Sequence, residues 1–125
     1  MRDAKLTFLE SVGYAIQGIK IAIRYNRNIR IHIVIAILVI ISAFLLGLNQ
    51  FEKAIICMII LLVISAEMIN TAIEEVVDLV TKDYREEAKY AKDVSAGMVL
   101  IVASGSIAVG FLVFTPHILK LIFPN

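Results

Sequence analysis

The sequence has little charge and only one cysteine, and both shortages narrow what the chain can do. Charged residues make up 18% of the 125 residues and the net charge is +1, so no strong electrostatic field attracts nucleic acid. No run of basic residues is interleaved with aromatics, as a nucleic-acid site requires. Cys57 cannot form an intrachain disulfide, and no Cys or His stands near it at metal-ligand spacing. From the low net charge and the lack of basic runs with aromatics, we expect no nucleic-acid partner.

Several enzyme motifs are also missing. The phosphate-binding loop GxxxxGK[ST], the zinc motif HExxH and the nucleophile motif GxSxG do not occur. Any chemistry on a nucleotide must therefore use a different kind of site. His32 and His117 are not expected to be catalytic, because each stands at the end of an apolar run.

Hydrophobic residues make up 60% of the chain, which is well above the share in soluble domains. They form three apolar runs, at 33–48, at 54–66 with an amphipathic continuation to about residue 80, and at 94–119. A helix needs ~20 mostly apolar residues to cross a bilayer. The third run reaches this length alone and the first does so with its flanks. The second reaches it only if Glu67 and Asn70 lie inside the membrane or at its edge.

These runs predict an all-α integral membrane protein with one domain over residues 1–125. We expect helices at about 31–50, 54–80 and 93–119, each with one span, and an N-terminal helix over 4–24. The N-terminal helix has one apolar stripe, formed by Leu6, Leu9, Val12, Ile16, Ile19 and Ile23. Such a helix can lie in the membrane interface. Packing against the rest of the domain is the alternative, although little soluble structure is available there.

The basic residues predict the orientation in the membrane. Ten of the twelve lysines and arginines precede the first span or lie in segment 81–93. Basic residues are retained on the cytoplasmic side. We therefore expect a multi-pass protein of the plasma (inner) membrane, with its N-terminus and segment 81–93 in the cytoplasm and its C-terminus outside.

Four polar residues of the second apolar helix share one face. With about 100° of rotation per residue, Glu67, Asn70, Glu74 and Asp78 fall within an arc of about 80°, and Glu75 lies outside it. Polar groups at membrane depth are costly and usually face a bundle interior or a water-filled cavity. A helix that simply leaves the membrane would explain Glu75 and Asp78, but it explains the deeper Glu67 and Asn70 less well.

Oxygen-rich side chains in this arrangement suit a hard cation such as Mg²⁺. A second carboxylate that holds no metal could act as a general base. Lys92 and Asp93 begin the third span, where Lys92 could meet a phosphate and Asp93 could cap the helix or hold a polar group of a ligand. A lysine extending toward the membrane surface is the alternative for Lys92.

The stretches AEMINTAIEEVVDLV (66–80) and AKYAKDVSAGMVLI (88–101) resemble the prokaryotic diacylglycerol kinase family. These are small integral-membrane lipid kinases. SVGYAIQGIK (11–20) and NRNIRIH (26–32) extend the resemblance over nearly the whole chain, and the version here is most similar to the Gram-positive branch of undecaprenol kinases.

The resemblance implies a homotrimeric bundle with an amphipathic surface helix and three transmembrane helices per chain. It also implies active sites shared between neighbouring chains at the cytoplasmic interface, with ATP as phosphate donor and Mg²⁺ as cofactor. Glu67 would be the catalytic base for the primary hydroxyl of the lipid, with Ala96 beside the lipid and Asn70 as a second catalytic residue. The nucleotide-binding positions would be Tyr14, Asn26, Glu74, Asp78, Asp83, Tyr84, Arg85, Lys92 and Asp93.

One position departs from the family pattern. The family usually has a glutamate at the position of Asn26, where it serves with Glu74 as a metal ligand. An asparagine oxygen can still bind Mg²⁺ but carries no charge, so we expect weaker metal binding, an altered metal or nucleotide preference, or lower activity.

These observations favour ATP-dependent phosphorylation of undecaprenol to undecaprenyl phosphate, with diacylglycerol as the alternative substrate. A degenerate family member that only binds nucleotide or lipid is a further reading, motivated by Asn26. An ion or proton pathway lined by Glu67 and Glu74 is a third, which the downstream A-K-D motif disfavours.

Overall fold

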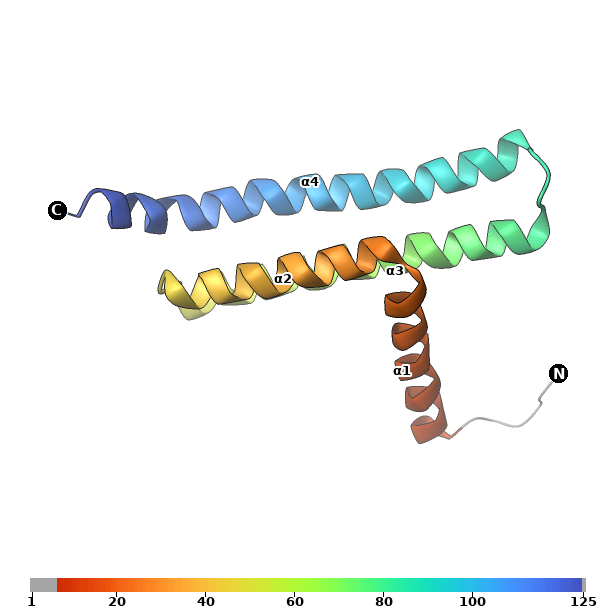
Figure 1. The fold of residues 1–125 in the computed structure, drawn as a ribbon, viewed down its shortest axis with the longest axis horizontal. Helices are drawn as coiled ribbons and strands as arrows, with labels where there is room; N and C mark the ends of the chain where they lie inside the picture. Colours follow the sequence, from red (N-terminus) through yellow and green to blue (C-terminus); the bar gives the residue numbers. More distant parts are fainter. Residues whose placement is uncertain (1–6, 125) are drawn as a thin grey trace.

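The structure is a computed structural model that describes residues 7–124. The chain forms four helices, α1 (Phe8–Tyr25), α2 (Arg27–Leu45), α3 (Gln50–Val80) and α4 (Glu86–Ile122). Figure 1 shows α2, α3 and α4 running alongside one another, while α1 projects from them at a steep angle. The all-helical fold class is therefore confirmed.

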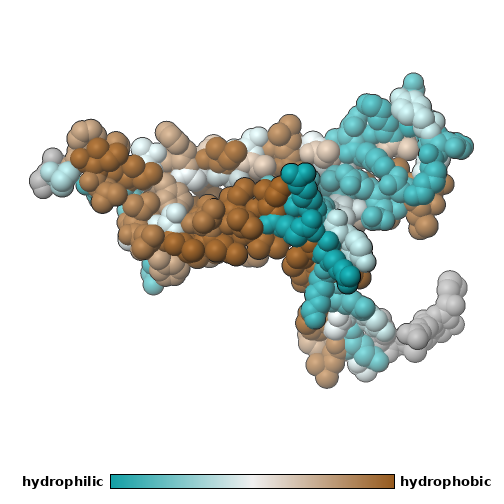
Figure 2. Space-filling view, in the orientation of Figure 1, coloured by the Kyte–Doolittle hydropathy of each residue, from teal (hydrophilic) through white to brown (hydrophobic). Residues whose placement is uncertain are grey.

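Three of these helices are long and apolar enough to cross a membrane. The best windows of α2, α3 and α4 have mean hydropathies of 2.3, 2.2 and 2.3. Figure 2 shows hydrophobic residues over much of the bundle and hydrophilic residues gathered where α3 leads into α4 and along part of α1. Most large apolar side chains are exposed. The buried apolar core is small and consists of Ile29, Ala36, Ala43, Leu48, Ile56, Val63 and Ala66. Outward-facing apolar side chains are what a lipid environment requires.

Helix α1 starts at a capping box. Thr7 Oγ1 accepts a hydrogen bond from the Glu10 backbone N–H at 3.4 Å, and the Thr7 N–H donates to the Glu10 carboxylate at 2.8 Å. The Thr7 backbone N–H, and then its hydroxyl, lower the pKa of Glu10 because both donate to the charged form. No residue of α1 is buried; Leu9, Val12, Ile16 and Ile19 of its apolar stripe are exposed, and Ile23 is half-buried. The first residues of the predicted helix 4–24, including Leu6, lie outside the described part of the chain.

The spanning helices begin before their apolar runs, and local caps explain why. Asn26 caps α2, so that α2 starts at Arg27. Asn49 and Glu52 form a second capping box that starts α3 at Gln50. Gly47 closes the tight turn between α2 and α3 with φ at +69°, a conformation that costs glycine little.

Helix α4 starts at Glu86, about two turns before its apolar run. Glu86 and Glu87 occupy its first turn, where negative charge interacts favourably with the helix dipole. The connection between α3 and α4 is therefore limited to residues 81–85.

Candidate functional site

The polar face of α3 runs from a buried end to an open end. Glu67 is 2% exposed and Asn70 is 6% exposed. Glu74 and Asp78 are half-buried, whereas Glu75, on another side of the helix, is exposed. The burial of Glu67 and Asn70 does not fit a solvated face of a helix that simply leaves the membrane.

Asn26 connects the junction of α1 and α2 to Glu67. Its Nδ2 donates to Glu67 Oε1 at 3.4 Å and also to the Thr71 hydroxyl. The Thr71 hydroxyl in turn donates to the backbone carbonyl of Glu67 at 2.9 Å. One amide group thus holds both the side chain of Glu67 and the neighbouring Thr71, so that the α1–α2 junction restrains the carboxylate.

The oxygen of Asn26 is used differently from what the resemblance implied. Asn26 Oδ1 accepts hydrogen bonds from the backbone N–H groups of Asn28 at 2.7 Å and Ile29 at 3.2 Å, which caps α2. A carbonyl oxygen has two lone pairs, so Asn26 could bind a metal only after releasing part of this cap. Arg30 stabilises the same junction by donating to the last carbonyls of α1, those of Ile23 at 3.1 Å and Arg24 at 2.7 Å.

Glu74 is a carboxylate that could hold a metal. It is half-buried next to the open end of the polar face, and one of its oxygens already accepts a hydrogen bond from Asn70 Nδ2 at 2.9 Å. Within residues 7–124, no three His, Cys, Asp or Glu side chains are grouped as a metal site. Mg²⁺ often takes only one or two protein carboxylates and completes its shell with phosphates and water. The donor set around Glu74 fits a metal that arrives with a nucleotide.

Helix α4 contributes Ser95 and Lys92 to this face. The buried Ser95 hydroxyl donates to Asn70 Oδ1 at 2.7 Å. Lys92 Nζ donates to Asp78 Oδ1 at 2.6 Å, and both side chains remain partly exposed, at 38% and 43%. Lys92 is therefore held by an acid at the open end, which accounts for its position better than free extension toward the membrane surface.

Asp93 forms an ion pair with Lys89 within α4, at 2.6 Å. Because α4 begins at Glu86, Asp93 lies inside the helix and does not cap it. Both members of the pair are largely exposed, so such a pair contributes little to stability. Asp93 remains accessible to a polar group of a ligand.

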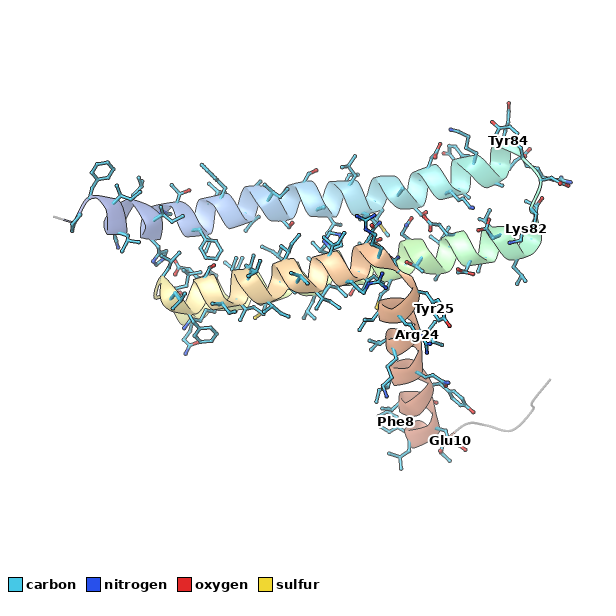
Figure 3. The ribbon with its side chains drawn as sticks, in the orientation of Figure 1. Phe8, Glu10, Arg24, Tyr25, Lys82 and Tyr84 are labelled. Atoms are coloured by element: carbon cyan, nitrogen blue, oxygen red, sulfur yellow. The ribbon has the colours of Figure 1, made fainter. Side chains whose placement is uncertain are left out.

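Other predicted site residues lie apart from this cluster within one chain. Tyr14 is exposed on α1. Asp83, Tyr84 and Arg85 are exposed in the connection between α3 and α4, and Ala96 is exposed on α4. Figure 3 shows Tyr84 at the far end of the α3–α4 hairpin, well away from α1. One chain therefore brings together Asn26, the polar face of α3, Lys92 and the adjacent Asp93, but not Tyr14, Asp83, Tyr84 and Arg85.

Two residues of this network were not anticipated from the sequence. Thr71 follows Asn70 directly, and Ser95 follows Lys92 by three residues. The only signal in the sequence was that each hydroxyl residue neighbours an expected site residue, Thr71 next to Asn70 and Ser95 next to Ala96. Neither signal identifies the partner, because the partners Asn26 and Asn70 lie 45 and 25 residues away in the chain.

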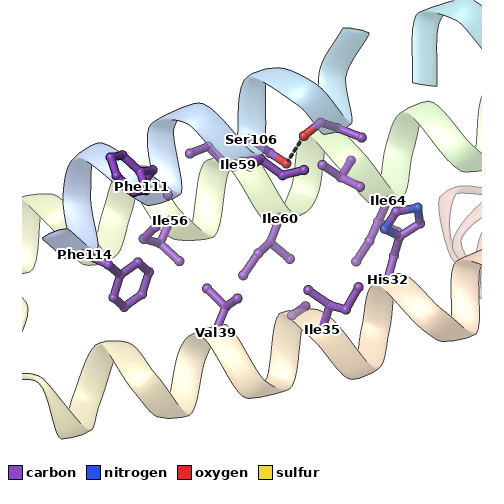
Figure 4. A pocket seen from close by; sticks show the side chains of 15 residues that line it. His32, Ile35, Val39, Ile56, Ile59, Ile60, Ile64, Ser106, Phe111 and Phe114 are labelled. Carbon is purple, nitrogen blue, oxygen red and sulfur yellow. Dashed lines mark hydrogen bonds between the residues drawn. The ribbon is translucent and has the colours of Figure 1, made fainter. Parts of the chain in front are cut away.

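An apolar groove of about 290 Å³ lies between α2, α3 and α4. Figure 4 shows His32 and Ile64 at one end and Phe111 and Phe114 at the other. Glu67 stands one helical turn beyond Ile64 on α3, so the groove ends close to the buried part of the polar face. The groove offers no carboxylate of its own.

The amino-acid sequence is similar to those of known bacterial lipid kinases. Residues 13–114 match the family model described as prokaryotic diacylglycerol kinase. The chain is 41% identical over 114 residues to a diacylglycerol kinase of Synechocystis sp., covering 90% of this chain and 65% of that protein, just under two thirds of its length. It is 40% identical over 111 residues to the undecaprenol kinase of Bacillus subtilis, covering 89% and 90%. It is 29% identical over 93 residues to the diacylglycerol kinase of Escherichia coli K12, covering 74% and 76%.

Proposed function

The chain belongs to the prokaryotic diacylglycerol kinase family, a family of lipid kinases, and from this premise we propose that it uses ATP to phosphorylate undecaprenol in the membrane. The observation that carries the proposal is the polar face of α3. It lies wholly within the matched residues 13–114, and its deepest members, Glu67 and Asn70, are buried between apolar helices. The similarity to the undecaprenol kinase of B. subtilis, which covers 90% of that protein, supports the choice of lipid.

Diacylglycerol is the second candidate substrate. The names of the Synechocystis and E. coli relatives favour it. Both lipids present a primary hydroxyl at the membrane surface, so the same polar face could serve either one. The product would be undecaprenyl phosphate in the first case and phosphatidic acid in the second.

Glu67 would act as the general base. It would accept the proton of the lipid hydroxyl as that oxygen attacks the terminal phosphate of ATP, and ADP would leave. The Asn26 amide restrains the Glu67 carboxylate through Oε1 at 3.4 Å, which would leave the other carboxylate oxygen to accept the proton of the alcohol. Phosphoryl transfer depends mainly on such positioning and on charge neutralisation.

Glu74 would hold Mg²⁺, which when bound neutralises charge on the ATP phosphates. Asn26 is the second proposed ligand, and it would have to release part of its cap on α2 to serve in that role. Lys92 would stay paired with Asp78 and donate another of its three ammonium hydrogens to a phosphate oxygen, and Asn70 would keep Glu74 oriented through its hydrogen bond of 2.9 Å.

Most of the remaining proposed contacts would come from a second copy of the chain. Tyr14, Asp83, Tyr84, Arg85 and Asp93 would approach the nucleotide, and Ala96 the lipid. We propose a homotrimer in which neighbouring chains share each active site, with α1 in the interface as an amphipathic surface helix. The many exposed apolar side chains of α2, α3 and α4 support such packing. The N-terminus and segment 81–93 would face the cytoplasm, where ATP is available.

A phosphorylation assay on the purified protein tests the proposal. Undecaprenol, diacylglycerol and shorter alcohols should be compared with ATP, with and without Mg²⁺. Glu67→Gln should abolish the reaction, whereas Glu75→Gln makes the same chemical change on the exposed side of α3 and should retain it. Equal activity in the two variants would rule out Glu67 as the base.

A further inference from the structure

Ser95 links α4 to the polar face of α3. It is 4% exposed and, with Glu67 and Asn70, is one of the buried polar residues in the described chain. Its Oγ lies 2.7 Å from Asn70 Oδ1 and 2.9 Å from the backbone carbonyl of Lys92. The second contact lies within α4, whereas the first joins two helices next to a proposed metal ligand.

The hydrogen bonds define the direction of the Asn70 amide. Glu74, when ionised, can only accept hydrogen bonds, so Asn70 must turn its Nδ2 toward Glu74 and its Oδ1 away. In the described chain, Ser95 is the hydrogen-bond donor to this Oδ1. The hydroxyl has one hydrogen, which it shares between Asn70 Oδ1 and the Lys92 carbonyl. Ser95 therefore supports, through the other end of the amide, the orientation in which Asn70 meets Glu74.

Loss of the hydroxyl would act on orientation more than on stability. Hydrogen bonds between membrane helices contribute little to stability on average. A buried oxygen without a donor, however, pays the full cost of its lost solvation. Asn70 would relieve this cost by rotating, and Glu74 would then lose the donor that fixes its carboxylate.

We propose that Ser95 is a positioning residue, which acts through Asn70 to hold the Glu74 carboxylate toward the phosphates of the nucleotide. This inference rests on the proposed function, because the role of Glu74 is defined there. Ser95 itself touches neither nucleotide nor lipid in this scheme.

Three variants of the full chain provide the test. Ser95→Ala removes the hydroxyl, Ser95→Thr retains it, and Ser42→Ala is the matched control because its hydroxyl bonds only to the carbonyl of Leu38 within α2. We expect Ser95→Ala to lower kcat/KM for ATP by roughly tenfold, the effect of losing one hydrogen bond that holds a carboxylate in place for the bound nucleotide. The KM for the lipid should not change, Ser95→Thr should recover most of the activity, and Ser42→Ala should match the unaltered protein.

A double-mutant cycle separates positioning from general support of the fold. In an Asn70→Ala background, Ser95→Ala should have no further effect, because Ser95 then has nothing to orient. An equal loss in both backgrounds would overturn the proposal. So would a kcat/KM for ATP in Ser95→Ala equal to that of the unaltered protein.

Nucleotide binding gives a measurement that does not depend on turnover. A non-hydrolysable ATP analogue with Mg²⁺ should raise the thermal midpoint of the unaltered protein, and Ser95→Ala should reduce this rise while Ser42→Ala does not. An equal rise in Ser95→Ala and the unaltered protein would overturn the positioning role. Absence of lipid phosphorylation by the unaltered protein would instead overturn the proposed kinase function, and a reduced rise in Ser95→Ala would still support the positioning role.

Discussion

Asn26 can be tested by replacing it with each of the two acidic residues. Asn26→Asp and Asn26→Glu both introduce a negative charge and both remove the amide that donates to Glu67 and Thr71. They differ in capping, because a short aspartate can still accept the backbone N–H groups of Asn28 and Ile29 as the asparagine does. Glutamate is too long to be a good N-cap.

The expected magnitudes follow from these contacts. Loss of the amide donors should cost each variant about 1 kcal/mol. A negative charge beside Glu67, where the amide now lies at 3.4 Å, adds a repulsion of about 5 kcal/mol or less at an effective dielectric constant of about 20. Loss of the cap costs Asn26→Glu a further ~1 kcal/mol. The charge is common to both variants, so their difference in stability isolates the cap.

Unfolding in detergent, with a chelator or with excess Mg²⁺, measures these effects. Without divalent cations, we expect both variants to be less stable than the unaltered protein, and Asn26→Glu to be the less stable of the two. Mg²⁺ should restore stability to both, because it relieves the repulsion between carboxylates. If Asn26→Glu equals Asn26→Asp without Mg²⁺, Asn26 does not act as the cap of α2. If Asn26→Glu neither raises turnover nor lowers the Mg²⁺ requirement, the missing carboxylate is not a handicap for the enzyme.

Two further predictions concern ion pairs and caps. Asp78→Asn should raise the KM for ATP because Lys92 loses the charged partner that positions it at 2.6 Å. The substitution should change the free energy of unfolding by less than about 1 kcal/mol because the pair is partly exposed. An unchanged KM in steady-state kinetics would contradict this role. Because the Thr7 backbone N–H and hydroxyl lower the pKa of Glu10, the capping box stabilises α1 at pH values above the unfolded pKa, and this stabilisation is lost as the pH falls through the lower folded pKa. The protection of the first-turn amides of α1, corrected for the intrinsic pH dependence of exchange, should therefore fall on acidification and fall less in Glu10→Gln. Identical behaviour of the two proteins would refute the assignment.

The sequence predicts the helical architecture well because membrane helices follow from the length of apolar runs. The runs 33–48, 54–66 and 94–119 correspond to α2, α3 and α4. Their starts were harder to predict because caps decide them: Asn26 and Asn49 begin helices outside the apolar runs, and the acidic first turn of α4 precedes its run by about two turns.

Periodicity predicts the candidate site only within one helix, and the family resemblance adds Asn26 and Lys92 from its neighbours. Helical periodicity puts Glu67, Asn70, Glu74 and Asp78 on one face, and this needs no knowledge of the neighbouring helices. Contacts between helices depend on their rotation and depth, which periodicity does not determine. The hydrogen bond from Ser95 to Asn70 and the double role of Asn26 therefore emerge only from the three-dimensional arrangement.

Phosphate transfer from ATP to undecaprenol by the purified protein is the decisive measurement for the lipid kinase assignment. We predict Mg²⁺-dependent formation of undecaprenyl phosphate by the unaltered protein and by Glu75→Gln, and none by Glu67→Gln. Faster phosphorylation of diacylglycerol than of undecaprenol would replace the proposed substrate. No phosphorylated lipid from any alcohol, in a protein that remains folded, would contradict the assignment of kinase activity to this chain.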